Sequence, residues 1–137
     1  MHGDIMMYEL RVVTRFAAAH QLRKVTEKCE NLHGHNWKVE LCVAGEKLQD
    51  SGVLMDFGVI KQRLGEIIDT LDHRFLNELP EFDSSNPSSE LIAKYIADAF
   101  SGHIRSGEGI FVSRVRVWES DDACASYSPP RRASSSS

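Results

Sequence analysis

Three histidines, His20, His33 and His35, have the residue type and the spacing of a metal site. His33 and His35 are two residues apart at the start of a segment that alternates like a β-strand, so both imidazoles should leave the same face. His20 ends the preceding alternating segment, which could pair alongside. Three imidazoles with one vacant coordination position would make a catalytic zinc site, although imidazole also suits iron, copper and nickel. The alternative is that the His-x-His pair occurs by chance and that His20 is a structural residue.

A candidate thiol precedes these histidines. Cys29 lies four residues before His33, within a polar and irregular stretch at residues 21–32 that we expect to be a loop. A nearby cation would lower the pKa of this thiol from about 8.5, which would make it a base or nucleophile near neutral pH. The alternative is an inert loop cysteine.

Two carboxylates complete the set of candidate groups. Asp72 precedes His73 at the predicted end of a helix, where the carboxylate could orient the imidazole for acid–base work if the helix stops there. Local sequence is equally compatible with a capping aspartate beside an exposed histidine. Glu119 ends a predicted strand, either as a solvated carboxylate or as a buried group that accepts two hydrogen bonds from a planar amidine-like edge.

The bulk properties restrict the class of protein. The chain of 137 residues has the size of one domain, and its formal net charge of -4 gives no global attraction to nucleic acid or to an anionic membrane. A small-molecule partner is therefore favoured. The sequence contains neither a long apolar span nor a signal peptide, so we expect a cytoplasmic protein. Its three cysteines are odd in number and irregularly spaced, which favours reduced thiols.

Alternation and helical spacing predict the elements that carry these residues. Residues 8–20 and 36–44 alternate as strands, and we expect the second to form a long hairpin with residues 53–55. Apolar residues three and four apart predict one helix over 57–71, capped by Asp56, and another over 89–100, capped by Ser88 or Ser89. Residues 110–118 predict a last strand that ends at Glu119.

The order of these elements is typical of an α+β domain with an antiparallel sheet and two helices on one face. We expect a flexible N-terminus at residues 1–6, a single catalytic domain at residues 7–127, and a disordered tail at residues 128–137. The helix-free face of the sheet would then require a partner.

Six segments in this order, FAAAH, CENLHGH, GVLMDF, LDHRFLN, NPSSE and VWE, resemble the 6-pyruvoyltetrahydropterin synthase and 6-carboxytetrahydropterin synthase family. The resemblance covers roughly residues 7–127. It implies the tunnelling fold, in which a four-stranded antiparallel sheet carries two helices and the sheets of three subunits join into a barrel. Two such rings would stack as a homohexamer.

The same resemblance implies a role for each candidate residue. It makes His20, His33 and His35 the zinc ligands, Cys29 the catalytic thiol, Asp72 and His73 the proton relay, and Glu119 the pterin anchor. A thiolate would remove a carbon-bound proton of dihydroneopterin triphosphate beside oxygens polarised by zinc. Arg23, Lys24 and Lys28 are candidates for contacts with the triphosphate.

The spacing from Cys29 to His33 resembles the 6-carboxytetrahydropterin branch, which implies release of acetaldehyde and triphosphate on the route to queuosine and other deazapurines. Glu30 departs from this pattern, because some relatives use a glutamate in place of the cysteine and cleave the side chain to 6-hydroxymethyldihydropterin for folate synthesis. Glu30 is thus a second candidate base, and the pyruvoyl and hydroxymethyl products remain alternatives. Ser88, where relatives usually carry threonine, retains a hydroxyl.

Two alternatives come from other functional classes. A zinc hydrolase would use the three histidines to activate water and would not require Cys29. A non-catalytic zinc-binding or pterin-binding module would tolerate loss of both Cys29 and His73 while still binding its ligand.

Overall fold

The computed structural model describes residues 6–22 and 33–131 of the chain. Its strands are β1 (Tyr8–His20), β2 (His33–Gly45), β3 (Arg74–Phe75), β4 (Ile110–Ser120) and β5 (Ala123–Tyr127). Its helices are α1 (Phe57–Ile68) and α2 (Ser89–Gly102), with the short 3-10 turns η1 (Leu76–Glu78) and η2 (Pro80–Phe82) between them. The predicted α+β organisation is confirmed.

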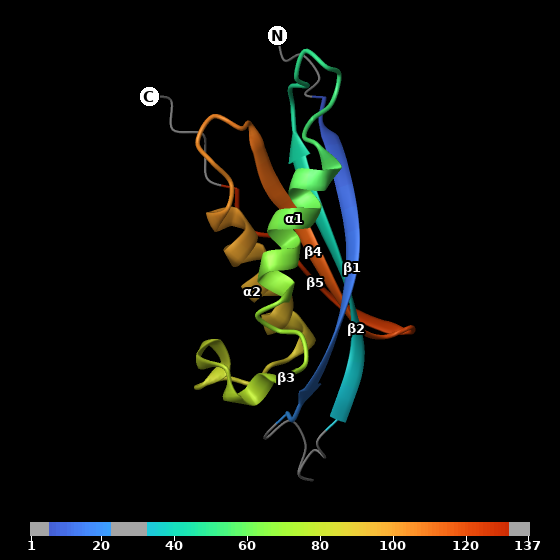
Figure 1. Cartoon of the computed structure of the whole chain (residues 1–137), viewed down its shortest axis with the longest axis vertical. Helices are drawn as coiled ribbons and strands as arrows, with labels where there is room; N and C mark the ends of the chain where they lie inside the picture. The colour runs from blue at the N-terminus through green and yellow to red at the C-terminus, as the bar shows by residue number, and fades with distance from the viewer. Residues whose placement is uncertain (1–5, 23–32, 132–137) are drawn as a thin grey trace.

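The strands form one sheet in the order β3-β1-β2-β4-β5. β1 pairs with β2, β2 with β4, and β4 with β5, all antiparallel. Figure 1 shows α1 and α2 lying side by side against one face of this sheet, while β4 and β5 continue away from the helices as a hairpin. The opposite face of the sheet carries no helix of the described chain.

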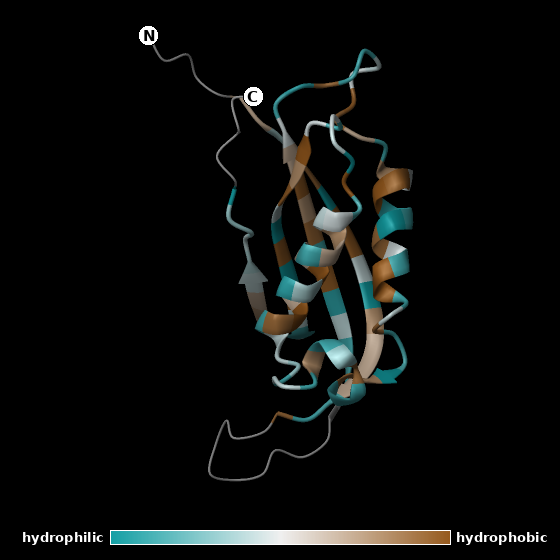
Figure 2. Ribbon diagram, turned by 90° about the vertical axis from the view of Figure 1, so that its left-hand side faces the viewer, coloured by the Kyte–Doolittle hydropathy of each residue, from teal (hydrophilic) through white to brown (hydrophobic). Residues whose placement is uncertain are grey.

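Strict alternation places one set of β1 and β2 side chains under the helices. Val12 lies opposite Leu41, and Phe16 lies opposite Trp37 with the two rings stacked at a centroid distance of 5.9 Å. These four side chains are buried, and their aliphatic and aromatic surface forms the centre of the core. Figure 2 shows the resulting bands of hydrophobic and hydrophilic residues along the strands and helices.

Both helices begin where the sequence predicts. The Asp56 carboxylate accepts a hydrogen bond from the Gly58 backbone N–H at 2.9 Å, and the Ser88 hydroxyl accepts one from Leu91 N–H at 3.2 Å. Each such cap is worth about 1 kcal/mol. Of the two serines proposed for the second helix, Ser88 is therefore the cap. Pro87, just before this cap, lies beside the end of β1, where its carbonyl is 2.9 Å from His20 Nδ1.

Residues 53–55 are not a strand, so the predicted hairpin with β2 is wrong. β2 is a central strand whose two edges are already occupied by β1 and β4, which leaves no edge for a further partner. The segment instead closes a turn, with Gln49 N–H donating to the Val53 carbonyl at 2.8 Å, and buries Leu54 and Met55 in the core.

The expected four-stranded antiparallel sheet also needs correction, because the sheet has five strands and is mixed. β3 pairs parallel with β1 through Arg74 and Phe75 only, and two residues are too few to give a periodic signal. β5, with the sequence ACASY, lacks the apolar alternation by which strands are recognised.

Neither α1 nor α2 is long and apolar enough to cross a membrane.

Candidate metal-binding and catalytic site

His20, the last residue of β1, is almost fully buried, with 3% of its surface exposed. Its Nδ1 lies 2.9 Å from the Pro87 backbone carbonyl, just before the Ser88 cap of α2. A carbonyl can only accept, so Nδ1 must carry the proton in this hydrogen bond. In the neutral ring the lone pair is then on Nε2, which is the tautomer that a metal ligand requires.

His35 lies beside His20 on the same side of the sheet. The register pairs His20 with His33 and Ala18 with His35, so the backbone places the His-x-His pair next to the end of β1 as expected. The rings of His20 and His35 are 4.9 Å apart at their centroids, and Trp37 packs edge-on against both. The side chain of His33 lies outside the described part of the structure.

Glu119 joins these two histidines from β4. Its Oε1 lies 3.0 Å from His20 Nε2 and 3.2 Å from His35 Nε2. The three residues together offer one ligand atom each within 4.8 Å of one another. The sequence predicted that this strand ends at Glu119, but it did not indicate that the Glu119 carboxylate contacts the histidines.

The electrostatics of this cluster fit a cation. His20 Nδ1 donates to Pro87, so Nε2 of the neutral ring and the Glu119 carboxylate oxygen would be two acceptors facing each other at 3.0 Å. This arrangement is unfavourable unless a positive charge lies between the two atoms or on the ring itself. Imidazole nitrogens and a carboxylate oxygen form a donor set that suits zinc and other first-row divalent metals. The residues present therefore fit a metal ion.

Asp72 and His73 follow α1 and lie along β1 at Ala17. Asp72 Oδ1 accepts a hydrogen bond from Ala17 N–H at 2.9 Å, and His73 N–H donates to the Ala17 carbonyl at 2.6 Å. His73 Nδ1 lies 3.0 Å from Asp72 Oδ1, so the predicted pairing of the two side chains is present. The hydrogen bond from Ala17 is the main cause of a lowered Asp72 pKa, and the positive charge that His73 carries when protonated adds to it.

The backbone at His73 is unusual and explains how adjacent residues pair. His73 has φ of 59°, in the left-handed region that L-residues rarely adopt. This conformation turns the chain sharply from α1 into β3, so the two neighbouring side chains are no longer on a helix and can meet. The imidazole is 81% exposed, which leaves its other nitrogen available to a ligand or a second subunit.

Two groups that fix the site were missed by sequence reasoning. The Pro87 carbonyl orients His20, and the Asn77 side chain binds the backbone of Gln21 with hydrogen bonds of 2.8 and 2.7 Å. Both contacts join segments more than 50 residues apart in the sequence, and neither residue carries the chemistry that a search for reactive groups detects. The only signal was the presence of Asn77 and Pro87 within the segments LDHRFLN and NPSSE.

Two of the predicted catalytic residues cannot be placed. Cys29 and Glu30 lie outside the described residues, as do the proposed triphosphate contacts Arg23, Lys24 and Lys28. Their roles stay predictions. The described groups that meet around one point are His20, His35 and Glu119, with Asp72 and His73 farther back along β1.

Known proteins resemble this chain over nearly its whole length. A protein from Synechocystis sp. named 6-carboxy-5,6,7,8-tetrahydropterin synthase is 36% identical over 121 residues, which cover 85% of this chain and 89% of that protein. A dihydroneopterin monophosphate aldolase from Pyrococcus furiosus is 32% identical over 114 residues, covering 82% and 91%. The structure of Caenorhabditis elegans 6-pyruvoyl tetrahydropterin synthase superposes with a TM-score of 0.79 at 25% identity, over 94% of this chain and 100% of that one.

These likenesses agree with the fold. The sequence model of one family, 6-pyruvoyl tetrahydropterin synthase, matches residues 9–130, which include every strand from Glu9 onward and both helices. All candidate residues, His20, Cys29, Glu30, His33, His35, Asp72, His73 and Glu119, fall within the matched region. The chain therefore belongs to the 6-pyruvoyl tetrahydropterin synthase family.

Proposed function

We propose that this protein is a zinc-dependent lyase that converts 7,8-dihydroneopterin triphosphate to 6-carboxy-5,6,7,8-tetrahydropterin with release of acetaldehyde and triphosphate. The observation that carries the proposal is the convergence of His20, His35 and Glu119 in a chain that is similar to a 6-carboxytetrahydropterin synthase over most of its length. The product would serve the synthesis of queuosine and other deazapurines. Reduced Cys42 and Cys124 support a cytoplasmic location.

The zinc ligands in this proposal are His20, His33 and His35. The tautomer that Pro87 imposes on His20 and the register that sets His33 opposite His20 both support this assignment. When bound, zinc would supply Lewis-acid polarisation of substrate oxygens. Trp37 packs edge-on against the imidazoles of His20 and His35 and would hold both rings in place in the metal-free protein. The two side chains would therefore lose little conformational freedom when metal binds.

Proton transfer is assigned to Cys29 and His73. The Cys29 thiolate would remove a carbon-bound proton from the substrate side chain, and the His73 imidazole would exchange the other proton through its exposed nitrogen. Asp72 would hold the His73 ring through the contact of 3.0 Å between His73 Nδ1 and Asp72 Oδ1. Because Asp72 is itself fixed by Ala17 N–H, the ring is positioned by the backbone of β1.

Glu119 is assigned to the pterin ring. Its carboxylate lies between the histidines and a pocket of about 430 Å³ that is lined by Glu119, Ser89, Glu90, Ala123, Cys124, Ala125 and Ser126. A pterin presents an N–H and an amino group side by side, an edge that a carboxylate can accept with two hydrogen bonds. Glu119 is 36% exposed, so the pterin can reach it from this pocket.

A homohexamer is part of the proposal. Among the described residues, β3 covers the outer edge of β1 only at Ala18 and Ala19, and Asp72 and His73 bind the backbone of Ala17, so the edge from Tyr8 to Phe16 presents unpaired backbone groups. Such a long open edge favours strand addition by another copy, and repetition of this pairing would close sheets into a barrel. The exposed His73 lies beside this edge and would be near the neighbouring subunit.

The side-chain cleavage that gives 6-hydroxymethyldihydropterin is the second candidate function. The sequence places Glu30 directly after Cys29, which supplies a carboxylate base next to the thiol. The similarity to a dihydroneopterin monophosphate aldolase favours the same kind of reaction. A 6-pyruvoyl product is the third outcome that the family allows. These candidates share the metal and pterin residues and differ in which bond of the side chain is broken.

Incubation of the zinc-loaded protein with 7,8-dihydroneopterin triphosphate, followed by mass spectrometry of the pterin, distinguishes the candidates. We expect 6-carboxytetrahydropterin and acetaldehyde, with loss of both in Cys29→Ala and retention in Glu30→Gln. Formation of a hydroxymethyl- or pyruvoyl-pterin would mean that the same site catalyses one of the other two candidate reactions. Absence of turnover, or full activity of Cys29→Ala, would contradict the proposal and favour a zinc hydrolase or a binding module.

A further inference from the structure

The face of the sheet opposite the helices is strongly basic. The strand register places Arg11, Arg15, Lys38, Arg114 and Arg116 on this face. Two carboxylates, Glu9 and Glu40, share it, so the strands β1, β2 and β4 carry five positive and two negative charges here, an excess of three. The complete chain has a formal net charge of -4, so positive charge is concentrated on one face of an acidic protein.

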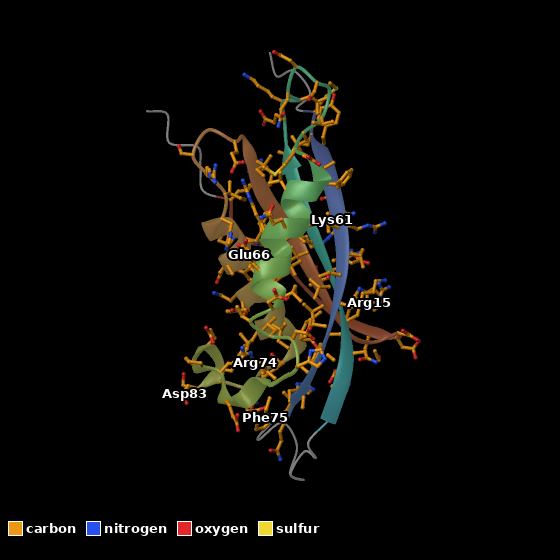
Figure 3. The ribbon with its side chains drawn as sticks, viewed as in Figure 1. Arg15, Lys61, Glu66, Arg74, Phe75 and Asp83 are labelled. Carbon is orange, nitrogen blue, oxygen red and sulfur yellow. The ribbon has the colours of Figure 1, made fainter. Side chains whose placement is uncertain are left out.

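The basic residues are neighbours across three strands. Arg15 lies opposite Lys38 in the β1–β2 pairing, and Lys38 lies opposite Trp118 in the β2–β4 pairing. Adjacent strands are about 4.8 Å apart, so the two cationic groups can contact one small anion together. Figure 3 shows the Arg15 side chain directed away from the helices, on the open side of the sheet.

A pocket of about 300 Å³ lies at this row. It is lined by Arg15, Asn36, Lys38, Trp118, Ser120 and Asp121. All of these residues except Asp121 carry N–H or O–H donors, and Trp118 Nε1 is a buried donor that lacks a hydrogen-bond partner among the described residues. The pocket therefore offers many hydrogen-bond donors to an anion, and its lining includes one carboxylate, that of Asp121, which would repel an anion.

Lys38 and Arg116 are paired on this face by charge only, whereas Arg114 donates a hydrogen bond to Cys42 Sγ at 3.7 Å. The Glu40 carboxylate is 8% exposed and lies 3.7 Å from Lys38 Nζ and 3.8 Å from Arg116 Nη1, both longer than a hydrogen bond. Glu40 Oε2 accepts no hydrogen bond from the described residues. Glu40 therefore holds the two cations in place by charge, while their N–H groups stay available to a ligand.

We propose that Arg15, Lys38 and the pocket around them bind a small polyphosphate anion. A chain of phosphoryl groups can use several cations in one row and accept bidentate hydrogen bonds from Arg15. The Lys38 ammonium lies 5.2 Å from the centroid of the Trp118 ring, so this ring is already covered and does not offer a free surface for base stacking. The geometry therefore favours the phosphate chain over a nucleic acid base.

This site is separate from the metal cluster. His35 and Trp37 point to the helix side of β2, whereas Asn36 and Lys38 alternate to the opposite side. Binding of the anion therefore does not require turnover of a pterin. The shared chemistry is a polyphosphate chain, which could be free or could be the tail of an organic triphosphate.

Calorimetric titration with inorganic tripolyphosphate tests the proposal. We expect a binding event in the wild type that is weakened about tenfold in Arg15→Gln and in Lys38→Gln, because each substitution removes a charge-assisted hydrogen bond, and that is distinct from any binding at the catalytic site. Asp121→Asn should strengthen binding roughly threefold, since it removes the negative charge that lines the pocket. Rising salt should weaken binding in the wild type more than in Lys38→Gln.

Three controls make the result specific. Lys61→Gln removes a charge from exposed α1 on the other side of the sheet and should bind as the wild type does. His35→Ala should also bind normally, which excludes chelation of a bound metal by tripolyphosphate. Equal circular dichroism and thermal midpoints for Arg15→Gln and Lys38→Gln would show that these variants are folded.

The outcomes are distinct. Unchanged binding in both Arg15→Gln and Lys38→Gln, or an equal loss in Lys61→Gln, would overturn the proposal, as would binding of single-stranded RNA without binding of tripolyphosphate. Competition between tripolyphosphate and neopterin triphosphate that is lost in Arg15→Gln and Lys38→Gln would support the site and identify it with an organic triphosphate tail. Tripolyphosphate binding without competition would support a site for the free anion.

Discussion

The Asn77 side chain forms two hydrogen bonds with the backbone of Gln21. Its Oδ1 accepts from Gln21 N–H at 2.8 Å, and its Nδ2 donates to the Gln21 carbonyl at 2.7 Å. Gln21 directly follows His20, and His20 is fixed on its other side by the Pro87 carbonyl. The chain that leaves the metal cluster is thus held in place by η1 and by the start of α2.

Replacing Asn77 with alanine should destabilise the protein by about 2 kcal/mol, because two partly buried hydrogen bonds of roughly 1 kcal/mol each are lost. Asn77→Asp should be comparably harmful, since a carboxylate cannot donate to the Gln21 carbonyl. Urea denaturation measures both changes. Gln62→Ala, which removes an exposed amide from α1, is the comparison for general loss of an amide. Wild-type stability of Asn77→Ala would show that the contact has no energetic role.

Removal of metal should also lower stability, because a ligand that binds only the folded state stabilises it. With free zinc about 100-fold above its dissociation constant, the loss on chelation would be about 2.7 kcal/mol. We expect chelator to lower the thermal midpoint of the wild type and to have no effect on His35→Ala. His103→Ala, which changes a histidine away from the cluster, should respond like the wild type. An unchanged midpoint of the wild type after verified zinc removal would contradict a stabilising metal at His20 and His35.

Local patterns predicted much of the fold. The alternation of Val12 and Phe16, and of Trp37 and Leu41, identified the buried faces of β1 and β2 because a half-buried strand imposes that period on its residues. The helix caps were also predictable, because the free N–H groups of a first turn favour a preceding side chain that can accept a hydrogen bond, such as that of Ser88. β3 and β5 were not predicted, because each forms only by pairing with a longer strand, β3 with β1 and β5 with β4.

The candidate site was predictable only in part. His20, His35 and Asp72 carry reactive groups, so residue type alone drew attention to them. The Pro87 carbonyl fixes the tautomer of His20, and the Ala17 N–H lowers the pKa of Asp72. Both contacts come from backbone atoms, which every residue possesses. No sequence pattern distinguishes such backbone partners, and they emerge only when the tertiary fold brings the segments together.

Asp72 gives a prediction about pH. Its folded-state pKa is lowered, mainly by the hydrogen bond from Ala17 N–H, from a reference value of 3.8. A lowered carboxyl pKa contributes stability that is present above the unfolded-state pKa and is lost as the pH falls through the folded-state pKa. Asp72→Asn should therefore be less stable than the wild type at neutral pH, with a difference that shrinks below about pH 4.

Denaturant titrations of Asp72→Asn and of the wild type measure this difference in stability. They should run from about pH 7, where carboxyl groups are ionised, to about pH 2, where they are protonated. Asparagine retains an oxygen that can accept from Ala17, so the comparison reports the charge. Asp98→Asn is the matched control, because that carboxylate lies on the exposed surface of α2 and pairs with Lys94. A stability difference for Asp72→Asn that persisted unchanged into the acid range would exclude the proposed linkage.

His73 should show a conflict between stability and function. Its φ of 59° costs an L-residue about 1–2 kcal/mol, whereas glycine adopts this conformation freely and loses about 0.5–1 kcal/mol of backbone entropy on folding. His73→Gly should therefore be more stable than the wild type by about 0.5–1 kcal/mol. The same change removes the imidazole assigned to proton transfer, so turnover of dihydroneopterin triphosphate should fall at least about 100-fold.

Urea denaturation and the pterin assay, carried out on the same preparation of His73→Gly, test both halves of this prediction. His103→Gly is the matched control, because His103 has φ of -88° and relieves no strain when replaced. That variant should lose about 0.5–1 kcal/mol of stability and retain activity. A destabilised His73→Gly would mean that contacts of the imidazole outweigh the backbone strain, and full activity would remove His73 from the proton relay. The expected combination, a gain in stability with a loss of turnover, would show that the left-handed turn is retained because it presents the imidazole beside Asp72.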